Sequence, residues 1–148
     1  MHSIQASFIA LALCAVAASS ALAQSDFAQV AAKESGAKVT ASGLVFRSLQ
    51  DGQGASPSAT DKVKVHYRGT FPDGKEFDSS YKRNQPIDFP LNAVIPCWTE
   101  GVQLMKVGGK AKLTCPPGIA YGARGAGGVI PPNATLQFEV ELIAIAGR

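Results

Sequence analysis

The stretch Val94-Ile95-Pro96-Cys97-Trp98-Thr99-Glu100 contains the only tryptophan of this 148-residue chain and one of its three cysteines. Pro96 suits the first position of a helix, because proline has no N–H to leave unpaired there and its fixed φ fits a helical turn. From Trp98 onward, apolar residues recur at helical spacing (Trp98, Val102, Met105) until two glycines end the pattern. This spacing predicts a short helix with one apolar side. Trp98 is then either an ordinary core residue or the floor of an apolar pocket, and the stretch alone leaves both open.

Segments on both sides of this helix alternate between apolar and polar residues, which is typical of half-buried strands. The alternation covers residues 63–68, 110–115 and 136–142, and residues 44–50 and 87–89 are further candidates for short extended segments. Strands with one apolar side favour an antiparallel sheet wrapped over the helix. His66 falls on the polar side of its strand, so we expect it to be solvated rather than catalytic.

The first residues have the composition of a targeting segment that is removed from the mature protein. Residues 1–25 contain no Asp, Glu, Lys or Arg, and residues 6–18 form a run of small apolar side chains. Ala21-Leu22-Ala23 fits the A-x-A pattern before a signal-peptidase cleavage site. A Lys or Arg is missing at the start, which a misassigned start codon would explain. We therefore expect residues 1–23 to be a signal peptide and the mature protein to be periplasmic or secreted.

The mature part is long enough for one domain with a substantial core and too short for two. We expect residues 24–42 to be an N-terminal tether with a short helical turn near 27–33, and residues 43–148 to be the domain. The net charge is +3, and the basic residues are scattered rather than gathered in a tract. This distribution argues against a nucleic-acid partner, and no association with a membrane is expected after cleavage.

Cys97 and Cys115 remain after cleavage of the signal peptide. In an oxidising compartment they would form a disulfide, which contributes about 3 kcal/mol by the chain-entropy estimate for a loop of about 18 residues. The alternative is a pair of buried thiols. A metal site is not expected, because His66 is the only histidine left and the chain has no CxxC pair.

The usual catalytic constellations are missing, since no Ser-His-Asp or Cys-His arrangement can be assembled. The glycine-rich segment 121–132 lacks the Gly-Lys-Ser/Thr of a phosphate-binding loop and leads into a strand. What stands out is a set of aromatic residues around Pro/Gly loops: Tyr67, Phe77, Phe89, Trp98, Tyr121 and Phe138. Such a set is typical of an apolar pocket with a few polar groups.

Several motifs together resemble the signature of the FKBP-type peptidyl-prolyl cis-trans isomerases. They are Val65-His-Tyr-Arg-Gly69, Asp73-Gly-Lys-Glu-Phe-Asp-Ser-Ser80, Val94-Ile-Pro96 with Trp98, Val107-Gly-Gly-Lys-Ala111, Ala120-Tyr-Gly122, Ile130-Pro-Pro-Asn-Ala-Thr-Leu136 and Phe138-Glu-Val-Glu-Leu142. They follow one another in the family's order over about residues 44–145. The chain resembles the secreted bacterial members of this family, the macrophage-infectivity-potentiator-like group.

The resemblance implies an α+β fold in which a twisted antiparallel sheet of about five strands wraps around one short α-helix. It implies that Trp98 is the floor of a proline-binding pocket. The residues expected to bind substrate or inhibitor are Tyr67, Phe77, Asp78, Arg83, Ile87, Val94, Ile95, Trp98, Tyr121, Ile130 and Phe138. Ile87 stands where the family often has an aromatic wall residue.

The resemblance also implies the activity: non-covalent rotation of X-Pro peptide bonds, with no cofactor and no metal. The expected catalytic residues are Asp78 at the pocket edge, the Ile95 N–H and the Tyr121 hydroxyl as donors to substrate carbonyls, and Tyr67 as the partner of Asp78. The expected partners are Pro-containing polypeptides and macrolide inhibitors. About 20 residues precede the domain, too few for the long dimerisation helix of the related group, so a monomer or at most a weak dimer is expected. The alternative function is a non-catalytic chaperone that holds apolar, Pro-containing segments.

Overall fold

The structure is a computed structural model, and it describes residues 27–146. The expected signal peptide and its cleavage site therefore lie outside the described residues. After a helical segment at residues 27–32, the elements are β1 (Ala37–Val39), β2 (Val45–Gln50), β3 (Lys62–Thr70), β4 (Glu76–Ser79), β5 (Ile87–Pro90), the short 3-10 helix η1 (Leu91–Ala93), α2 (Pro96–Gln103), β6 (Lys110–Cys115), the 3-10 helix η2 (Pro117–Ile119) and β7 (Leu136–Ile145). No helix in this described part is long and apolar enough to cross a membrane.

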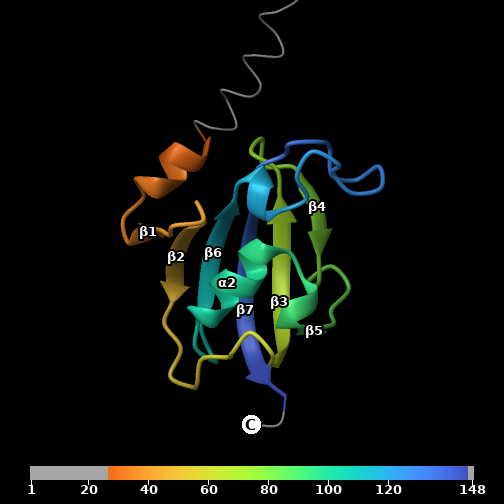
Figure 1. The fold of residues 1–148 in the computed structure, drawn as a ribbon. Helices are drawn as coiled ribbons and strands as arrows, with labels where there is room; N and C mark the ends of the chain where they lie inside the picture. Colours follow the sequence, from red (N-terminus) through yellow and green to blue (C-terminus); the bar gives the residue numbers. More distant parts are fainter. Residues whose placement is uncertain (1–26, 147–148) are drawn as a thin grey trace, which may run out of the picture.

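All strands belong to one antiparallel sheet with the order β1-β2-β6-β7-β3-β4, and β5 pairs with the other end of β3. The sheet curves around α2, which lies against one of its faces (Figure 1). The α+β architecture implied by the resemblance is therefore confirmed. The sheet has seven strands rather than about five, because it also includes the three-residue β1 and the short β4.

The predicted strands form where side chains alternate between core and solvent. β3 and β7 follow this pattern most regularly and pair along their length, with Tyr67 opposite Val140 and Gly69 opposite Phe138. The strand period of two therefore places Val63, Val65 and Tyr67 on the buried face. This face of the sheet meets α2.

Helix α2 begins at Pro96, as the sequence predicts, with Ile95 as its N-cap residue. Trp98, Val102 and Met105 are buried beneath it, whereas Leu104 is half exposed. The helix approaches the sheet closely at Gly101, where a Cβ atom would come within 2.8 Å of the Leu113 side chain. Glycine at this position therefore allows α2 to pack directly on β6.

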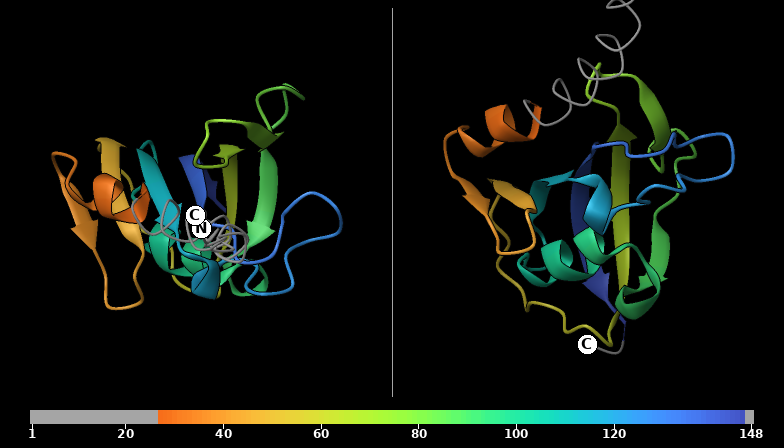
Figure 2. Two further views of the ribbon diagram at one scale, coloured as in Figure 1. Left: turned by 90° about the horizontal axis from the view of Figure 1, so that it is seen from above. Right: turned by 45° about the horizontal axis from the view of Figure 1, so that its top comes forward.

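The segment expected to be a tether contributes to the sheet, so the sheet begins before the expected domain boundary at residue 43. Residues 27–32 are helical, in line with the expected turn, and β1 pairs with β2. Glu34 forms ion pairs with Arg47 and Lys112, with N–O distances of 2.6 and 2.8 Å. This segment and the loop at residues 121–132 lie on opposite sides of the molecule (Figure 2).

His66 lies on the outer face of β3, as predicted, but it is not freely solvated. Its ring stacks on Tyr81 with a centroid separation of 4.6 Å, and its Nδ1 lies 2.8 Å from the buried Ser80 hydroxyl. The expectation of a solvated histidine is wrong, because the loop after β4 folds back over the outer face of the sheet. The alternation within β3 predicts that His66 is on the outer face of the sheet. It does not predict that another segment of the chain covers this face.

Candidate active site

Trp98 is the centre of an aromatic cluster, because its place in the first turn of α2 directs the indole towards the buried face of the sheet. The side chain is 4% exposed. The rings of Tyr67, Phe89 and Phe138 lie 5.2–5.5 Å from the indole, with interplanar angles of 81–89°. Edge-to-face contacts of this kind are the preferred geometry of aromatic pairs. Three rings from three different strands thus stand perpendicular to the indole plane.

A cavity of about 450 Å³ opens beside this cluster. Its lining consists of Tyr67, Phe77, Asp78, Phe89, Ala93, Val94, Ile95, Trp98, Tyr121 and Phe138. The lining comes from β3, β4, β5, η1, α2 with its N-cap, the loop before β7, and β7. A cavity of this size with mostly apolar walls and a few polar groups suits a small apolar group of a ligand.

Most of the residues expected at the site from the sequence are brought together here, including Trp98, Tyr121 and Asp78. Three of them do not line the cavity. Ile130 is buried in the core, Ile87 packs against the core from β5, and Arg83 makes its contacts with Asp78 and Tyr67 from outside the wall.

Two lining residues, Phe89 and Ala93, were missing from the residues expected to bind substrate, although Phe89 belongs to the aromatic set noted in the sequence. Phe89 lies two residues after Ile87 in the same strand, so the two side chains share a face. Phe89 forms an aromatic wall of the cavity, whereas Ile87 does not line it. The two-residue period of a strand would have predicted that Phe89 faces the same side as Ile87. No sequence pattern predicts that Ala93, which lies in η1, borders the cavity.

A polar network closes one edge of the cavity. The Tyr67 hydroxyl donates to Asp78 Oδ2, and Arg83 donates from its two terminal nitrogens to Asp78 Oδ1 at 2.7 Å and to the Tyr67 oxygen at 3.2 Å. The Ser79 N–H donates to Asp78 Oδ1 at 2.9 Å. The carboxylate is therefore fixed in position by several donors.

The pKa values in this network follow from burial and from these bonds. Burial raises the pKa of Asp78, but the hydrogen bonds from Tyr67 and Arg83 outweigh it, so the pKa lies below its ordinary value. Burial, together with the hydrogen bond to Asp78, raises the pKa of Tyr67. At neutral pH the edge of the cavity therefore carries an ionised Asp78 beside a neutral Tyr67.

The indole Nε1 of Trp98, which lines the cavity, is buried without a hydrogen-bond partner, and two further donors of the lining also have no acceptor within the described residues. One is the main-chain N–H of Ile95, whose carbonyl oxygen accepts the first helical hydrogen bonds. The other is the hydroxyl of Tyr121, a side chain that is 41% exposed. Because both groups border the same cavity, they are available to the carbonyl oxygens of a bound ligand.

Cys97 and Cys115 form a disulfide, and both are fully buried. Of the two alternatives that the sequence left open, a disulfide and a pair of buried thiols, the structure therefore contains the disulfide. The bond connects the first turn of α2 with the end of β6, directly beside Trp98 in the chain. Within residues 27–146, no group of three or more His, Cys, Asp or Glu side chains is arranged to hold a metal ion.

Comparison with known proteins gives consistent matches. The sequence model of the family described as "FKBP-type peptidyl-prolyl cis-trans isomerase" matches residues 53–143. The chain is 59% identical over 114 residues to "FKBP-type peptidyl-prolyl cis-trans isomerase FkpA" of Aeromonas hydrophila, covering 77% of this chain and 42% of the relative. It is 54% identical over 114 residues to the "FKBP-type 22 kDa peptidyl-prolyl cis-trans isomerase" of Escherichia coli K12, covering 77% and 55%. The chain thus spans about half the length of these curated relatives.

Solved structures are similar over most of the chain. FkpA from Escherichia coli superposes with a TM-score of 0.83 at 46% identity, covering 87% of this chain and 60% of that one. A peptidyl-prolyl cis-trans isomerase from Pseudomonas syringae pv. tomato superposes with a TM-score of 0.80 at 40% identity, covering 88% and 96%. The likeness therefore includes the strands and the helix that form the aromatic cavity.

Proposed function

The chain belongs to the family of FKBP-type peptidyl-prolyl cis-trans isomerases, and from this membership we propose that it catalyses rotation about X-Pro peptide bonds of polypeptides. The observation that carries the proposal is the box of Tyr67, Phe89 and Phe138 around the Trp98 indole, bordered by two donors without acceptors. A prolyl ring is small and apolar enough to enter this cavity. The donors then face the carbonyl groups on either side of it.

The physical basis is the resonance of the amide bond. Rotation about an X-Pro bond has a barrier of about 18–20 kcal/mol, because the C–N bond has partial double-bond character. Water stabilises the polar planar amide more than the twisted amide, in which resonance is lost. A cavity with aromatic walls removes this water and so favours the twisted state. A rate gain of about 10⁶ requires roughly 8 kcal/mol of such preference.

Each polar group has a proposed role in this rotation. The Ile95 N–H and the Tyr121 hydroxyl hold substrate carbonyls, while the prolyl ring stays against Trp98. Asp78 faces the rotating amide from the cavity edge, and its bonds to Tyr67 and Arg83 keep it ionised and oriented. No covalent bond forms or breaks in this step.

The proposal includes the setting of the activity. We expect the mature protein to be exported after cleavage near Ala23, to act as a monomer on Pro-containing segments of exported proteins, and to bind the macrolide inhibitors of the family. The alternative is a module that holds such segments without turnover. A fixed carboxylate and two free donors in one cavity favour turnover, because binding of an apolar segment alone needs none of them.

The test is proline-limited refolding of a model protein in the presence of the purified mature protein. Wild type is compared with Asp78→Ala and Tyr121→Phe, each with and without a macrolide. Asp88→Ala and Tyr81→Phe are matched controls, since Asp88 is exposed on β5 and Tyr81 contacts Glu141 instead of the cavity.

The proposal expects faster refolding that the macrolide blocks and that Asp78→Ala or Tyr121→Phe weakens while both controls keep it. Suppressed aggregation without any faster refolding would assign the non-catalytic role instead. If the control variants lost as much activity as Asp78→Ala and Tyr121→Phe, the aromatic cavity would not be the catalytic site.

A further inference from the structure

Ser80 is a fully buried polar residue that has no part in the mechanism proposed above. It directly follows β4, at the point where the chain leaves the sheet. Its side chain is 0% exposed, whereas the next residue, Tyr81, is 39% exposed. A buried hydroxyl is almost always hydrogen-bonded, so the partners of Ser80 indicate what this residue holds in place.

The first partner is the main chain of Tyr67. β4 pairs with residues 68–70 of β3 and β5 pairs with residues 62–65, both on the side of β3 away from β7 (Figure 1). Tyr67 lies in the gap between these two pairings. Its N–H donates to the Ser80 hydroxyl at 2.8 Å, and its carbonyl oxygen accepts from the Ser80 N–H at 3.0 Å. Ser80 therefore supplies the partners that a paired strand would otherwise supply to Tyr67.

The second partner is the loop that carries Arg83. The Ser80 carbonyl oxygen accepts from the N–H of Arg83 at 3.2 Å and from the N–H of Gln85 at 3.3 Å. Asn84 has a φ of 49°, in the left-handed region that asparagine adopts more readily than most residues. The chain thus turns tightly after Ser80. This turn returns the Arg83 guanidinium to the sheet, where it donates to Asp78 Oδ1 at 2.7 Å.

The outer face of the sheet covers Ser80. The Nδ1 atom of His66 lies 2.8 Å from the Ser80 hydroxyl oxygen. The His66 ring stacks on the ring of Tyr81 with a centroid separation of 4.6 Å, and the Tyr81 hydroxyl donates to Glu141 at 3.0 Å. This cover explains why Ser80 is buried although it lies in a loop. Water therefore does not compete for the hydrogen bond between Ser80 and the Tyr67 N–H.

We propose that Ser80 is a positioning residue for Asp78, because it holds Tyr67 and Arg83 at the separation at which both donate to the Asp78 carboxylate. The Tyr67 hydroxyl and the Arg83 guanidinium are the two side-chain donors to this carboxylate among the contacts described above. The action of Asp78 on the rotating amide rests on the proposed function. Ser80 does not line the aromatic cavity, so it acts through these residues and not on the substrate.

The variant Ser80→Ala removes the hydroxyl and leaves the buried Tyr67 N–H without its acceptor. Burial raises the pKa of Asp78, and the hydrogen bonds from Tyr67 and Arg83 lower it. We expect these bonds to weaken in Ser80→Ala, so an NMR titration of the Asp78 carboxyl carbon should give a higher pKa than in the wild type. Because a small displacement of a catalytic group is costly, kcat/KM for a short Pro-containing peptide should fall about tenfold.

Thr114→Val is the matched control, since it also removes a buried hydroxyl. Thr114 is 1% exposed on β6, and its hydroxyl accepts a hydrogen bond from the Gln137 side chain on β7. The pKa of Asp78 and kcat/KM should both stay at their wild-type values in this variant. An unchanged pKa of Asp78 in Ser80→Ala, or an equal shift in Thr114→Val, would overturn the proposal.

A double-mutant cycle separates positioning from a general contribution to the fold. In an Asp78→Asn background, Ser80→Ala should lower kcat/KM much less than in the wild type, because no carboxylate is left to position. Equal loss in both backgrounds would show that Ser80 does not act through Asp78.

Hydrogen exchange in the wild type is a test that needs no variant. The Tyr67 amide should exchange as slowly as the amides of β3 that pair with other strands, because Ser80 replaces the missing strand partner. Fast exchange of this amide would overturn the proposal even if Ser80→Ala does not fold. A wild type that isomerises nothing would refute the proposed function, whereas the Asp78 titration and the Tyr67 exchange would still decide whether Ser80 holds this network.

Discussion

Cys97 on α2 and Cys115 on β6 are joined by a disulfide, with their Cα atoms 5.8 Å apart. Cys97 directly precedes Trp98, so the bond fixes the first turn of the helix that carries the cavity floor. The two cysteines are 18 positions apart, and a closed loop of this length contributes about 3 kcal/mol by the chain-entropy estimate.

We therefore expect reduction of the disulfide to lower the free energy of unfolding by about 3 kcal/mol. Denaturant unfolding of the mature protein with and without a reductant measures this change. The double variant Cys97→Ser, Cys115→Ser is the control, since its stability should be low and independent of the reductant. Identical unfolding curves for the wild type under both conditions would contradict a stabilising disulfide.

Trp98 is the only tryptophan of the chain, so its fluorescence reports on the cavity floor alone. We expect binding of a macrolide to change the emission, because a ligand in the cavity alters the surroundings of the indole. A fluorescence titration gives the dissociation constant, and calorimetry on the same sample provides an independent value. Heat of binding without any change in emission would place the ligand away from Trp98.

The pH dependence of stability follows from the lowered pKa of Asp78. A carboxyl whose pKa is lower in the folded state stabilises the fold above its unfolded pKa, near 3.8, and this contribution is lost as pH falls through the folded pKa. The stability difference between wild type and Asp78→Asn should therefore be constant from neutral pH down to about 5 and decrease at lower pH. Urea unfolding across this range measures it.

Asp88→Asn is the matched control for this experiment, because Asp88 is an exposed aspartate on β5. Its stability difference from wild type should vary less with pH. A wild-type advantage over Asp78→Asn that grows as the solution is acidified would show that the sign of the pKa shift is wrong.

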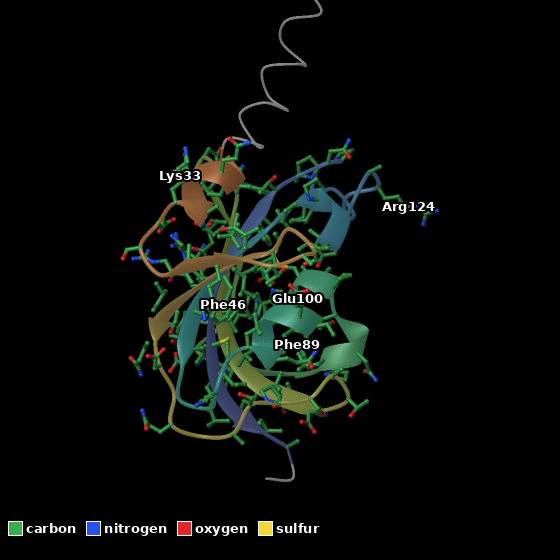
Figure 3. The ribbon with its side chains drawn as sticks, turned by 60° about the vertical axis from the view of Figure 1, so that its left-hand side comes forward. Lys33, Phe46, Phe89, Glu100 and Arg124 are labelled. Carbon is green, nitrogen blue, oxygen red and sulfur yellow. A yellow bond between two sulfur atoms is a disulfide. The ribbon has the colours of Figure 1, made fainter. Side chains whose placement is uncertain are left out.

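Glu100 on α2 holds the N-terminal segment against the helix (Figure 3). Its Oε1 accepts hydrogen bonds from the Thr40 and Ser42 hydroxyls at 2.5 and 2.9 Å. We expect Glu100→Ala to lower the free energy of unfolding by about 1 kcal/mol and to increase hydrogen exchange at residues 37–43. Glu139→Ala, at an exposed position of β7, should leave exchange in that segment unchanged, and equal exchange in both variants would exclude this role of Glu100.

The elements whose signal is local were predictable from the sequence. The alternation in residues 63–68, 110–115 and 136–142 indicated β3, β6 and β7, and Pro96 marked the start of α2. The family motifs indicated which aromatic side chains surround Trp98. Local patterns suffice in these cases because burial on one face imposes a period of 2 on a strand and 3.6 on a helix.

The tertiary structure alone decided which residues from different segments meet. β1 has no alternation long enough to detect, and it joins the sheet because its edge pairs with β2. Phe89 packs edge-to-face on Trp98 and lines the cavity, whereas Ile87 does not line it. Arg83 reaches Asp78 only because the loop after β4 folds back. Register and loop path depend on contacts between distant positions, which no periodicity within one segment contains.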